Sequence, residues 1–396
     1  MAKRDNLSIM NLTDFTTLTS LEKKGNLGYA EELYNPLNFF KVVHHISFDP
    51  NDNNIKLKNP TIKVHTIKII WRRIPIIRWI ANTLFAFTQI FQIALKYKVC
   101  LIRGRSPYHA SLLGLIAGKL LRIPFVVSIG GNYRLSNELA GQYPLFNSKF
   151  FSEKEEEIVL RFADLVICPN EYSKDYAVSI GVLPEKTCVI PLRLENDIFN
   201  FTCQESDILS SNGIDVNKPI ILSVSRFEGD KQIDVLIETI PLVTKIHPEA
   251  QFVLLGDGSL RDKMENRVVE LGQERNVYFL GYQSTEIVKY CLSRVAVVCV
   301  PMSGFVVHEA AAASKAIIAF DVEWHSEFIK DGETGLLVKN RDCKKLAGAI
   351  CRLLSNPKLV SLLGNNARSL IDIKYNPEVL AKKEIAELLK VIHRNA

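Results

Sequence analysis

The fold is decided by the stretch IILSVSRFEGDKQIDVLIETIPLVTKIHPEAQFVLLGDG, which occupies residues 220–258. It begins with an apolar run of strand length and continues through residues 233–246, where apolar side chains recur at helical spacing. It ends in a second apolar run that is closed by glycines. A strand, a helix and a further strand in this order are typical of a parallel sheet covered by helices. The stretch therefore predicts an α/β fold.

The same alternation extends in both directions along the chain. Towards the C-terminus, apolar runs predict strands at 277–282, 295–301, 316–321 and 335–338, and helical spacing predicts a helix at 344–354. In the first half, further runs indicate strands at 99–104, 124–131 and 163–170, preceded by SIMNL and KVVHHISF.

A chain of 396 residues is too long for one ordinary core, so two domains are expected. A polar segment between Pro191 and Pro219 separates two series of strands and helices. We therefore expect an N-terminal domain over 1–200, a C-terminal domain over 201–375 and a final helix over 376–396.

The composition, with 47% apolar and 23% charged residues, is typical of a globular protein. The eight cysteines are scattered, without a CxxC pair or a Cys/His cluster at metal-ligand spacing, so we interpret them as reduced core thiols. The polar N-terminus does not show the pattern of a secretory signal. These features favour a cytoplasmic location and no bound metal.

Positive charge is concentrated in the first half, since no acidic residue occurs between Asp52 and Glu138. Within the basic region 56–134, the segment WRRIPIIRW at 71–79 combines cations with tryptophans, which suit the boundary of a bilayer. We expect this domain to dock on the inner face of an anionic membrane and reach a lipid-linked acceptor. A buried helix with solvated ends is the alternative, and polar residues within 74–95 argue against a true span.

The first motif that carries chemistry is Ser225-Arg226-Phe227-Glu228-Gly229-Asp230-Lys231. A cation at the end of a strand and another five residues later, where a helix begins, can converge on a diphosphate. Arg226 and Lys231 are therefore predicted to bind a diphosphate. The alternative is an exposed turn with two ordinary surface charges.

The second motif is PMSGFVVHEAAAA, at residues 301–313. Ser303 can cap a helix, Gly304 allows a ligand to approach the backbone, and Glu309 can accept hydrogen bonds from a ribose diol. Alternatively, Glu309 only interacts favourably with the helix dipole.

The glycines that follow two strands, in Gly256-Asp257-Gly258 and at Gly281, are weaker signals, because such glycines often only turn the chain. Because they lie between the two motifs along the chain, they strengthen the prediction of a ligand site. In doubly wound sheets, ligands bind outside the carboxyl ends of the strands.

From about residue 220 to 339 the chain resembles the family 4 retaining glycosyltransferases, whose GT-B fold has two facing Rossmann-like domains. Arg226 and Lys231 match the family's spacing of arginine and lysine, although Ser225 replaces a glycine. Gly256-Asp257-Gly258 matches the family's Gly-Asp-Gly, and DGETGLLV at 331–338 matches a later motif. The resemblance implies a nucleotide diphosphate sugar as donor, retention at the anomeric carbon and a last helix that crosses back to the N-terminal domain.

One departure from the family concerns a pair of glutamates separated by seven residues. Glu309 matches the second, whereas Pro301 stands at the first. We expect Ser303 and backbone amides near Gly304 to replace the missing carboxylate, or catalysis to be weaker.

The first half matches the family in outline only. Gly130-Gly131-Asn132 stands where relatives often carry a catalytic histidine or aspartate. His109, which follows Arg103-Gly104-Arg105, is a candidate general acid or base in the cleft. The alternative is that His109 is a structural residue whose ring nitrogens are hydrogen-bonded within the protein.

The sequence thus predicts a glycosyltransferase that uses no cofactor and stabilises the leaving diphosphate with cations in place of a metal. The predicted catalytic residues are Arg226, Lys231, Glu309 and His109. The predicted donor-binding residues are Ser225, Gly256, Asp257, Gly258, Gly281, Tyr282, Ser303, Gly304, Phe305 and Val306.

Two alternatives to a transferase stay open, and nucleic-acid binding is a weaker third. A sugar-nucleotide epimerase shares the fold, but its usual pair of histidine and carboxylate is not evident. A catalytically silent relative that binds lipid or a partner would explain Pro301. Nucleic acid is not an expected partner, because the basic residues lack interleaved aromatic or recognition motifs.

Overall fold

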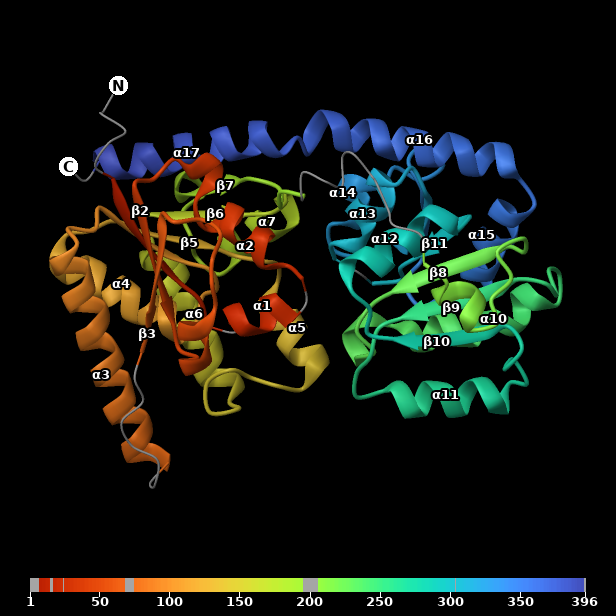
Figure 1. Ribbon diagram of the computed structural model, residues 1–396, viewed down its shortest axis with the longest axis horizontal. Helices are drawn as coiled ribbons and strands as arrows, with labels where there is room; N and C mark the ends of the chain where they lie inside the picture. The colour runs from red at the N-terminus through yellow and green to blue at the C-terminus, as the bar shows by residue number, and fades with distance from the viewer. Residues whose placement is uncertain are drawn as a thin grey trace. The chain divides into compact units, whose positions relative to one another are not determined.

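The computed structural model describes residues 7–14, 17–23, 25–67, 75–194, 206–302 and 304–394, without the side chains of 75–78 and 140. The chain forms two compact units, each with one parallel sheet and covering helices (Figure 1). Unit 1 contains Met1–Arg193 and Glu378–Ala396, and unit 2 contains Leu194–Pro377. The chain therefore changes unit within the polar segment from Pro191 to Pro219, and its last helix belongs to the first unit.

Unit 1 has a seven-stranded sheet in the order β3-β2-β1-β4-β5-β6-β7. Its strands are β1 (Ser8–Leu12), β2 (Val42–Ser47), β3 (Ile62–Thr66), β4 (Leu101–Gly104), β5 (Phe125–Ser128), β6 (Leu165–Cys168) and β7 (Thr187–Val189). Its α-helices are α1 (Leu18–Lys23), α2 (Leu27–Tyr34), α3 (Pro75–Lys96), α4 (His109–Leu121), α5 (Tyr133–Ala140), α6 (Lys149–Phe162), α7 (Glu171–Ser179) and α17 (Pro377–Arg394). The sequence did not predict β3 or β7, which are the two edge strands.

Unit 2 has a six-stranded sheet in the order β10-β9-β8-β11-β12-β13. Its strands are β8 (Ile220–Val224), β9 (Gln251–Leu255), β10 (Val277–Gly281), β11 (Val297–Cys299), β12 (Ala316–Phe320) and β13 (Leu336–Val338). Its α-helices are α9 (Ile208–Ser211), α10 (Ile233–Thr244), α11 (Arg261–Glu270), α12 (Thr285–Arg294), α13 (Val306–Ala312), α14 (His325–Phe328), α15 (Cys343–Leu354) and α16 (Pro357–Lys374). Every strand predicted in this half lies where the sequence indicated, which confirms the α/β fold class.

The two sheets share a topology in which the first strand lies in the middle and the order reverses beside it. In unit 1 the reversal lies between β1 and β4, and in unit 2 it lies between β8 and β11. All strand pairs in both sheets are parallel. A doubly wound sheet of this kind binds ligands outside the carboxyl ends of its strands, at the reversal.

Helices on both faces explain why the strands are apolar at nearly every position. In β8, Ile221 packs into one core layer of unit 2 and the next residue, Leu222, packs into the opposite layer. Successive strand residues point to opposite faces, so both must be apolar when both faces are covered. The sequence pattern of unit 2 follows directly from this burial.

The C-terminal helix α17 is held on unit 1 by apolar and ionic contacts. Leu388 and Val391 share a core layer with Ile9 of β1. Glu384 is buried in an ion pair with Arg103 and in another with Arg193, 3.2 Å away. Burial raises the pKa of the Glu384 carboxyl, but Arg103 and the neighbouring arginines outweigh it and hold the pKa below its ordinary value.

A helix that spans a membrane must be both long enough and apolar enough. No single described helix meets both requirements. The bent pair Cys343–Leu354 and Pro357–Arg394 meets them only when its two parts, which are inclined by 101°, are taken together.

We predict that Glu384→Gln destabilises the protein by roughly 3 kcal/mol or more, because Arg103 and Arg193 would stay buried without a counter-charge. Urea unfolding followed by circular dichroism would measure the loss. The control is Glu387→Gln on the same helix, whose pair with Lys390 is solvent-exposed on the lysine side and should contribute about 1 kcal/mol or less. Equal stability of the two variants would contradict the structural role of Glu384.

Candidate functional site

The loops that follow β8, β9 and β10 form one hydrogen-bonded layer at the carboxyl edge of the unit 2 sheet. The Ser225 amide donates to the Leu255 carbonyl at 2.9 Å, and the Phe227 amide donates to the Asp257 carbonyl at 2.9 Å. The Gly256 amide donates in turn to the Gly281 carbonyl at 2.8 Å. Three segments that the sequence singled out separately are therefore one structural unit.

Two glycines permit this packing. Gly256 has a φ of +138°, and a β-carbon there would lie 1.7 Å from the Ser225 carbonyl oxygen. A β-carbon at Gly258 would lie 2.5 Å from the Phe227 carbonyl oxygen. Both residues are glycines because the backbone of the Arg226 loop occupies the space of a side chain. Their direct effect is to position that loop.

Arg226 and Lys231 converge on one carboxylate. The Asp230 Oδ2 atom lies 3.3 Å from a guanidinium nitrogen of Arg226 and 2.8 Å from the ammonium nitrogen of Lys231. The carboxylate is buried, whereas the Arg226 side chain is 68% exposed. The short 3-10 turn Gly229–Lys231 brings the lysine back towards the arginine. Two cations are thus held side by side, with one of them largely in solvent.

A contact joins this loop to the second motif. The Gln232 side-chain amide lies 3.7 Å from the Met302 sulfur. Glu323, after β12, is close enough to Lys231 and Asp230 for both to affect its ionisation. Burial raises the pKa of Glu323, while His325 and Lys231 oppose that rise. The ends of β8, β11 and β12 therefore meet in one neighbourhood.

The second motif is described except at Ser303, so the predicted cap by Ser303 lies outside the described residues. Helix α13 begins at Val306 with Phe305 in the capping position. Gly304 is exposed, and Glu309 is partly buried in the first turn of the helix. Pro301, at the position of the family's first glutamate, is buried, and its carbonyl accepts from the Phe320 amide at 3.0 Å.

The remaining predicted donor-binding residues line the same layer. The Ser225 hydroxyl donates to the Arg226 carbonyl at 3.2 Å. Asp257 accepts from the Gly258 amide and pairs with Arg261 at 3.4 Å. Tyr282 follows β10 with most of its ring in solvent.

Unit 1 has a pocket of about 300 Å³ at the carboxyl edge of its own sheet. It is lined by residues that follow or end β1, β4, β5, β6 and β7, together with side chains from α2 and α17. Its charged residues are Arg103, Arg105, Arg193 and Glu384. The sequence did not single out this group, because Arg193 and Glu384 are remote from the other two along the chain.

His109 is not one of the residues that line this pocket. Its Nε2 lies 3.2 Å from the Thr83 hydroxyl, and its ring packs against Trp79 with centroids 5.4 Å apart. Its Nδ1 is 3.7 Å from a Glu155 carboxylate oxygen, which is longer than a hydrogen bond. A role for His109 as general acid or base stays a prediction.

Asp14, after β1, is a further titratable group that the sequence analysis missed. It accepts hydrogen bonds from the Ser106 hydroxyl and the Ala110 amide, at the start of α4. Burial raises the pKa of its carboxyl to about 6, although both hydrogen bonds oppose that rise. No periodic pattern marks such a residue, since its burial depends on segments far along the chain.

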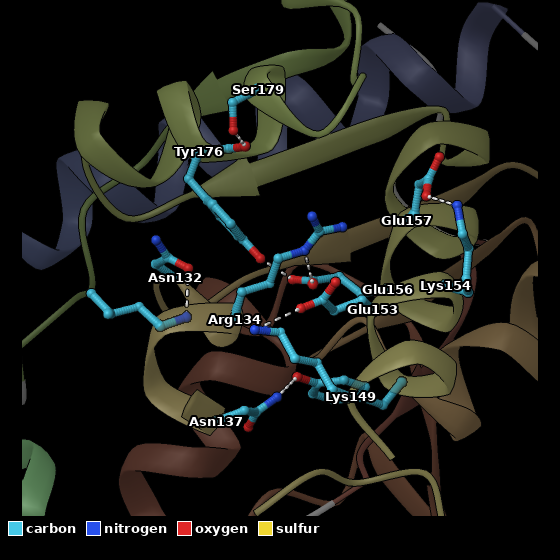
Figure 2. A network of polar contacts seen from close by, with 12 residues as sticks. Asn132, Arg134, Asn137, Lys149, Glu153, Lys154, Glu156, Glu157, Tyr176 and Ser179 are labelled. Atoms are coloured by element: carbon cyan, nitrogen blue, oxygen red, sulfur yellow. Dashed lines mark hydrogen bonds and ion pairs between the residues drawn. The ribbon is translucent and has the colours of Figure 1, made fainter. Parts of the chain in front are cut away.

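Part of the basic region of unit 1 is neutralised within the fold. Figure 2 shows Arg134 of α5 and Tyr176 of α7 both directed at Glu156 of α6. The Arg134 guanidinium lies 3.2 Å from one carboxylate oxygen, and the Tyr176 hydroxyl donates to the other at 2.5 Å. Arg134 is therefore paired within the fold, and Arg103 is only 2% exposed, so neither adds an unpaired charge to the surface.

Two doubly wound units with charged loops at the carboxyl edges of their sheets are the architecture of GT-B enzymes. Residues 43–192 match the family model described as Glycosyltransferase Family 4, and residues 204–370 match the model described as Glycosyl transferases group 1. The chain belongs to the family 4 glycosyltransferases with the GT-B fold.

Two similar proteins are named as glycosyltransferases. The chain is 32% identical over 169 residues to a poly(ribitol-phosphate) alpha-N-acetylglucosaminyltransferase of Staphylococcus aureus, a match that covers 41% of this chain and 34% of that relative. It is 26% identical over 274 residues to an alpha-D-kanosaminyltransferase of Streptomyces kanamyceticus, covering 67% of this chain and 70% of the relative. The first match thus spans about a third of the relative's length.

Solved structures agree on the fold. A sucrose-phosphate synthase from Thermosynechococcus elongatus superposes with a TM-score of 0.78 at 21% identity, over 98% of this chain and 100% of that one. Anabaena Alr3699/HepE, solved in complex with UDP, superposes with a TM-score of 0.73 at 19% identity, over 97% of this chain and 100% of that one.

We predict that Gly256→Ala destabilises unit 2 by about 2 kcal/mol or more, since the β-carbon adds a backbone clash to an unfavourable φ. The matched control is Gly272→Ala, which also has a positive φ, +66°, but has no atom within 4 Å of the added carbon. Thermal unfolding of both variants separates the clash from the strain. A Gly256→Ala variant as stable as Gly272→Ala would contradict the tight packing of the loop layer.

Proposed function

We propose that this glycosyltransferase takes its sugar from a nucleotide diphosphate sugar and that unit 2 binds this donor. The observation that carries the proposal is the convergence of Arg226 and Lys231 on Asp230 in the loop layer after β8, β9 and β10. A diphosphate can take over both cations in charge-assisted hydrogen bonds. The complex of Anabaena Alr3699/HepE with UDP supports a nucleotide donor for a protein of this fold.

In the proposed reaction, Asp230 keeps the two cations in position before the donor arrives. The acceptor hydroxyl oxygen forms a bond to the anomeric carbon while the bond from that carbon to the diphosphate oxygen breaks. The proton of the hydroxyl passes to the departing diphosphate, on the same face of the sugar, so the anomeric configuration is retained. Arg226 and Lys231 stabilise the negative charge that develops on the leaving group, as fixed cations do in a pre-organised site.

Two further roles belong to this proposal. Glu309, in the first turn of α13, accepts hydrogen bonds from the ribose hydroxyls of the donor. Arg226 and Lys231 take the place of a metal ion at the diphosphate, so turnover should persist in the presence of a chelator. The anomeric configuration of the product, observed by proton NMR, tests retention independently of both roles.

We expect Arg226→Ala and Lys231→Ala each to weaken donor binding by about 1.5 to 3 kcal/mol, the contribution of a hydrogen bond to a charged group. Isothermal titration with UDP-, GDP- and ADP-sugars would identify the base and measure the loss. Arg352→Ala, an exposed arginine of α15 in the same unit, is the control for a simple change of net charge. Unchanged affinity and turnover in both site variants would remove the donor-site assignment.

The acceptor side of the proposal concerns the surface of unit 1. We infer that this unit docks on an anionic membrane and acts on a lipid-linked acceptor or a glycan precursor. The segment 71–74 lies outside the described residues, and support comes from its neighbours. Trp79 of α3 contacts Phe146, with ring centroids 4.9 Å apart, and Phe146 contacts Phe151 of α6 at 6.1 Å. Phe150 of α6 is 64% exposed beside them.

These four residues, Trp79, Phe146, Phe150 and Phe151, form an aromatic patch. Ile80 and Leu84 on α3 are exposed, the latter to 61%. Large apolar side chains that gather on one surface mark an interaction site more often than isolated ones do. Aromatic rings suit the headgroup level of a bilayer, and basic residues close to the bilayer surface add attraction to anionic lipid.

Sedimentation with vesicles should therefore show binding to anionic and not to neutral lipid, with a loss at high salt because exposed charges are screened. Phe150→Ser and Leu84→Ser should each reduce the bound fraction. Ile373→Ser, on an equally apolar exposed position of α16 in unit 2, should leave it unchanged. Equal absence of binding to both kinds of vesicle at low salt would overturn the membrane proposal and favour a soluble acceptor.

A further inference from the structure

The pocket of unit 1 contains more positive than negative charge. Arg103 and Arg105 come from the end of β4, Arg193 follows β7, and Glu384 comes from α17. Three guanidinium groups thus share one carboxylate among the pocket-lining residues. Since buried charges are normally paired, the excess calls for a counter-ion.

Two of the arginines are engaged by the protein. Arg103 pairs with Glu384 and donates to the Ser128 hydroxyl at 3.0 Å. Arg193 pairs with the same carboxylate at 3.2 Å and donates to the Glu32 carbonyl at 3.1 Å. One nitrogen of Arg103, Nη1, is buried without a hydrogen-bond partner, although the residue is only 2% exposed. This buried donor of Arg103 is therefore unsatisfied among the described residues.

Arg105 is not engaged in the same way. Its guanidinium lies over the ring of Tyr34, 5.7 Å from the centroid, and the structure shows no ion pair for it among the residues described. Burial and the nearby charge of Arg103 together lower the pKa of Arg105 to about 10, while Glu384 acts in the opposite sense. Arg105 stays protonated at neutral pH, so its positive charge is the unbalanced one.

We propose that this pocket binds a phosphate group of the acceptor, held by Arg105, with Arg103 and Arg193 adding positive charge beside it. The charged residues that line the pocket carry a net charge of +2, which favours a phosphate over a carboxylate. A phosphate monoester carries about 1.5 to 2 negative charges at pH 7 and three acceptor oxygens, whereas a carboxylate carries one charge. Planar guanidinium forks also match phosphate oxygens in pairs. This inference rests on the proposed transferase function, of which it specifies the acceptor.

The size and walls of the pocket define what accompanies the phosphate. A cavity of about 300 Å³ is at the small end of the range for ligand sites. Leu33, Ile129 and Ile190 provide apolar walls beside the arginines. The pocket therefore fits a phosphorylated polyol or sugar of a few carbons, or the phosphate end of a longer acceptor.

The test is calorimetric titration of the full chain with glycerol 3-phosphate, inorganic phosphate and glycerol. Each titration uses the Arg226→Ala, Lys231→Ala background, which removes the competing cations of unit 2 whether or not they bind a nucleotide. Arg105→Gln is added to remove the unbalanced charge, and Arg105→Lys to restore it without the planar fork. Arg161→Gln, an exposed arginine of α6 in the same unit, is the matched control.

Glycerol 3-phosphate should bind the background protein and glycerol should not. Arg105→Gln should weaken binding at least tenfold, Arg105→Lys should recover part of it, and Arg161→Gln should have no effect. Tighter binding of glycerol 3-phosphate than of inorganic phosphate identifies an ester of the acceptor as the ligand, rather than a free ion. Circular dichroism of Arg105→Gln confirms that the variant is folded.

Three outcomes would overturn the inference: no binding of either phosphate, binding that Arg105→Gln leaves unchanged, or equal binding of glycerol and glycerol 3-phosphate. Failure of the proposed function is distinguishable, since it would show as a lack of nucleotide binding in the parent protein. Phosphate binding that depends on Arg105 would survive that failure.

Discussion

Parallel pairing of every strand is the constraint on which both units depend. Because all strands in a sheet run the same way, every carboxyl end lies on one edge, and the loops that follow the strands meet there. In unit 2 this edge joins the loops of Ser225, Gly256 and Gly281 by backbone hydrogen bonds. In unit 1 it joins Arg103, Arg105 and Arg193 around one pocket. Crossover helices cover both faces, so apolar strands and polar edges are two consequences of one topology.

Folding places the basic residues of unit 1 in environments that their order along the sequence does not show. The stretch after Asp52 is free of acidic residues along the sequence, yet its arginines have separate environments in the fold. Arg134 is neutralised by Glu156, and Arg103 by Glu384 of the last helix. Arg105 is left with an aromatic ring as its neighbour. A cation in a pocket interacts more strongly with an anion than one in water, because less solvent screens it.

In unit 2, neighbouring residues of the proposed donor-site loops have different structural roles. Gly256 and Gly258 give room to the backbone of the Arg226 loop, so their contribution is steric. Asp230, which the spacing of the two cations did not highlight, is the group that gathers Arg226 and Lys231. Pro301 leaves the edge without the family's first glutamate, and its carbonyl instead supports β12 through Phe320.

The sequence by itself determined the α/β class and the strands of unit 2. These features follow from local periodicity and turn residues, which a few neighbouring positions encode. It did not reveal the edge strands β3 and β7, since short, partly exposed strands have weak apolar patterns. Only tertiary structure decided that Arg103, Arg193 and Glu384 meet, and that His109 faces Thr83 and Trp79 instead of the pocket. Such contacts join residues far apart in the chain, and no local spacing records them.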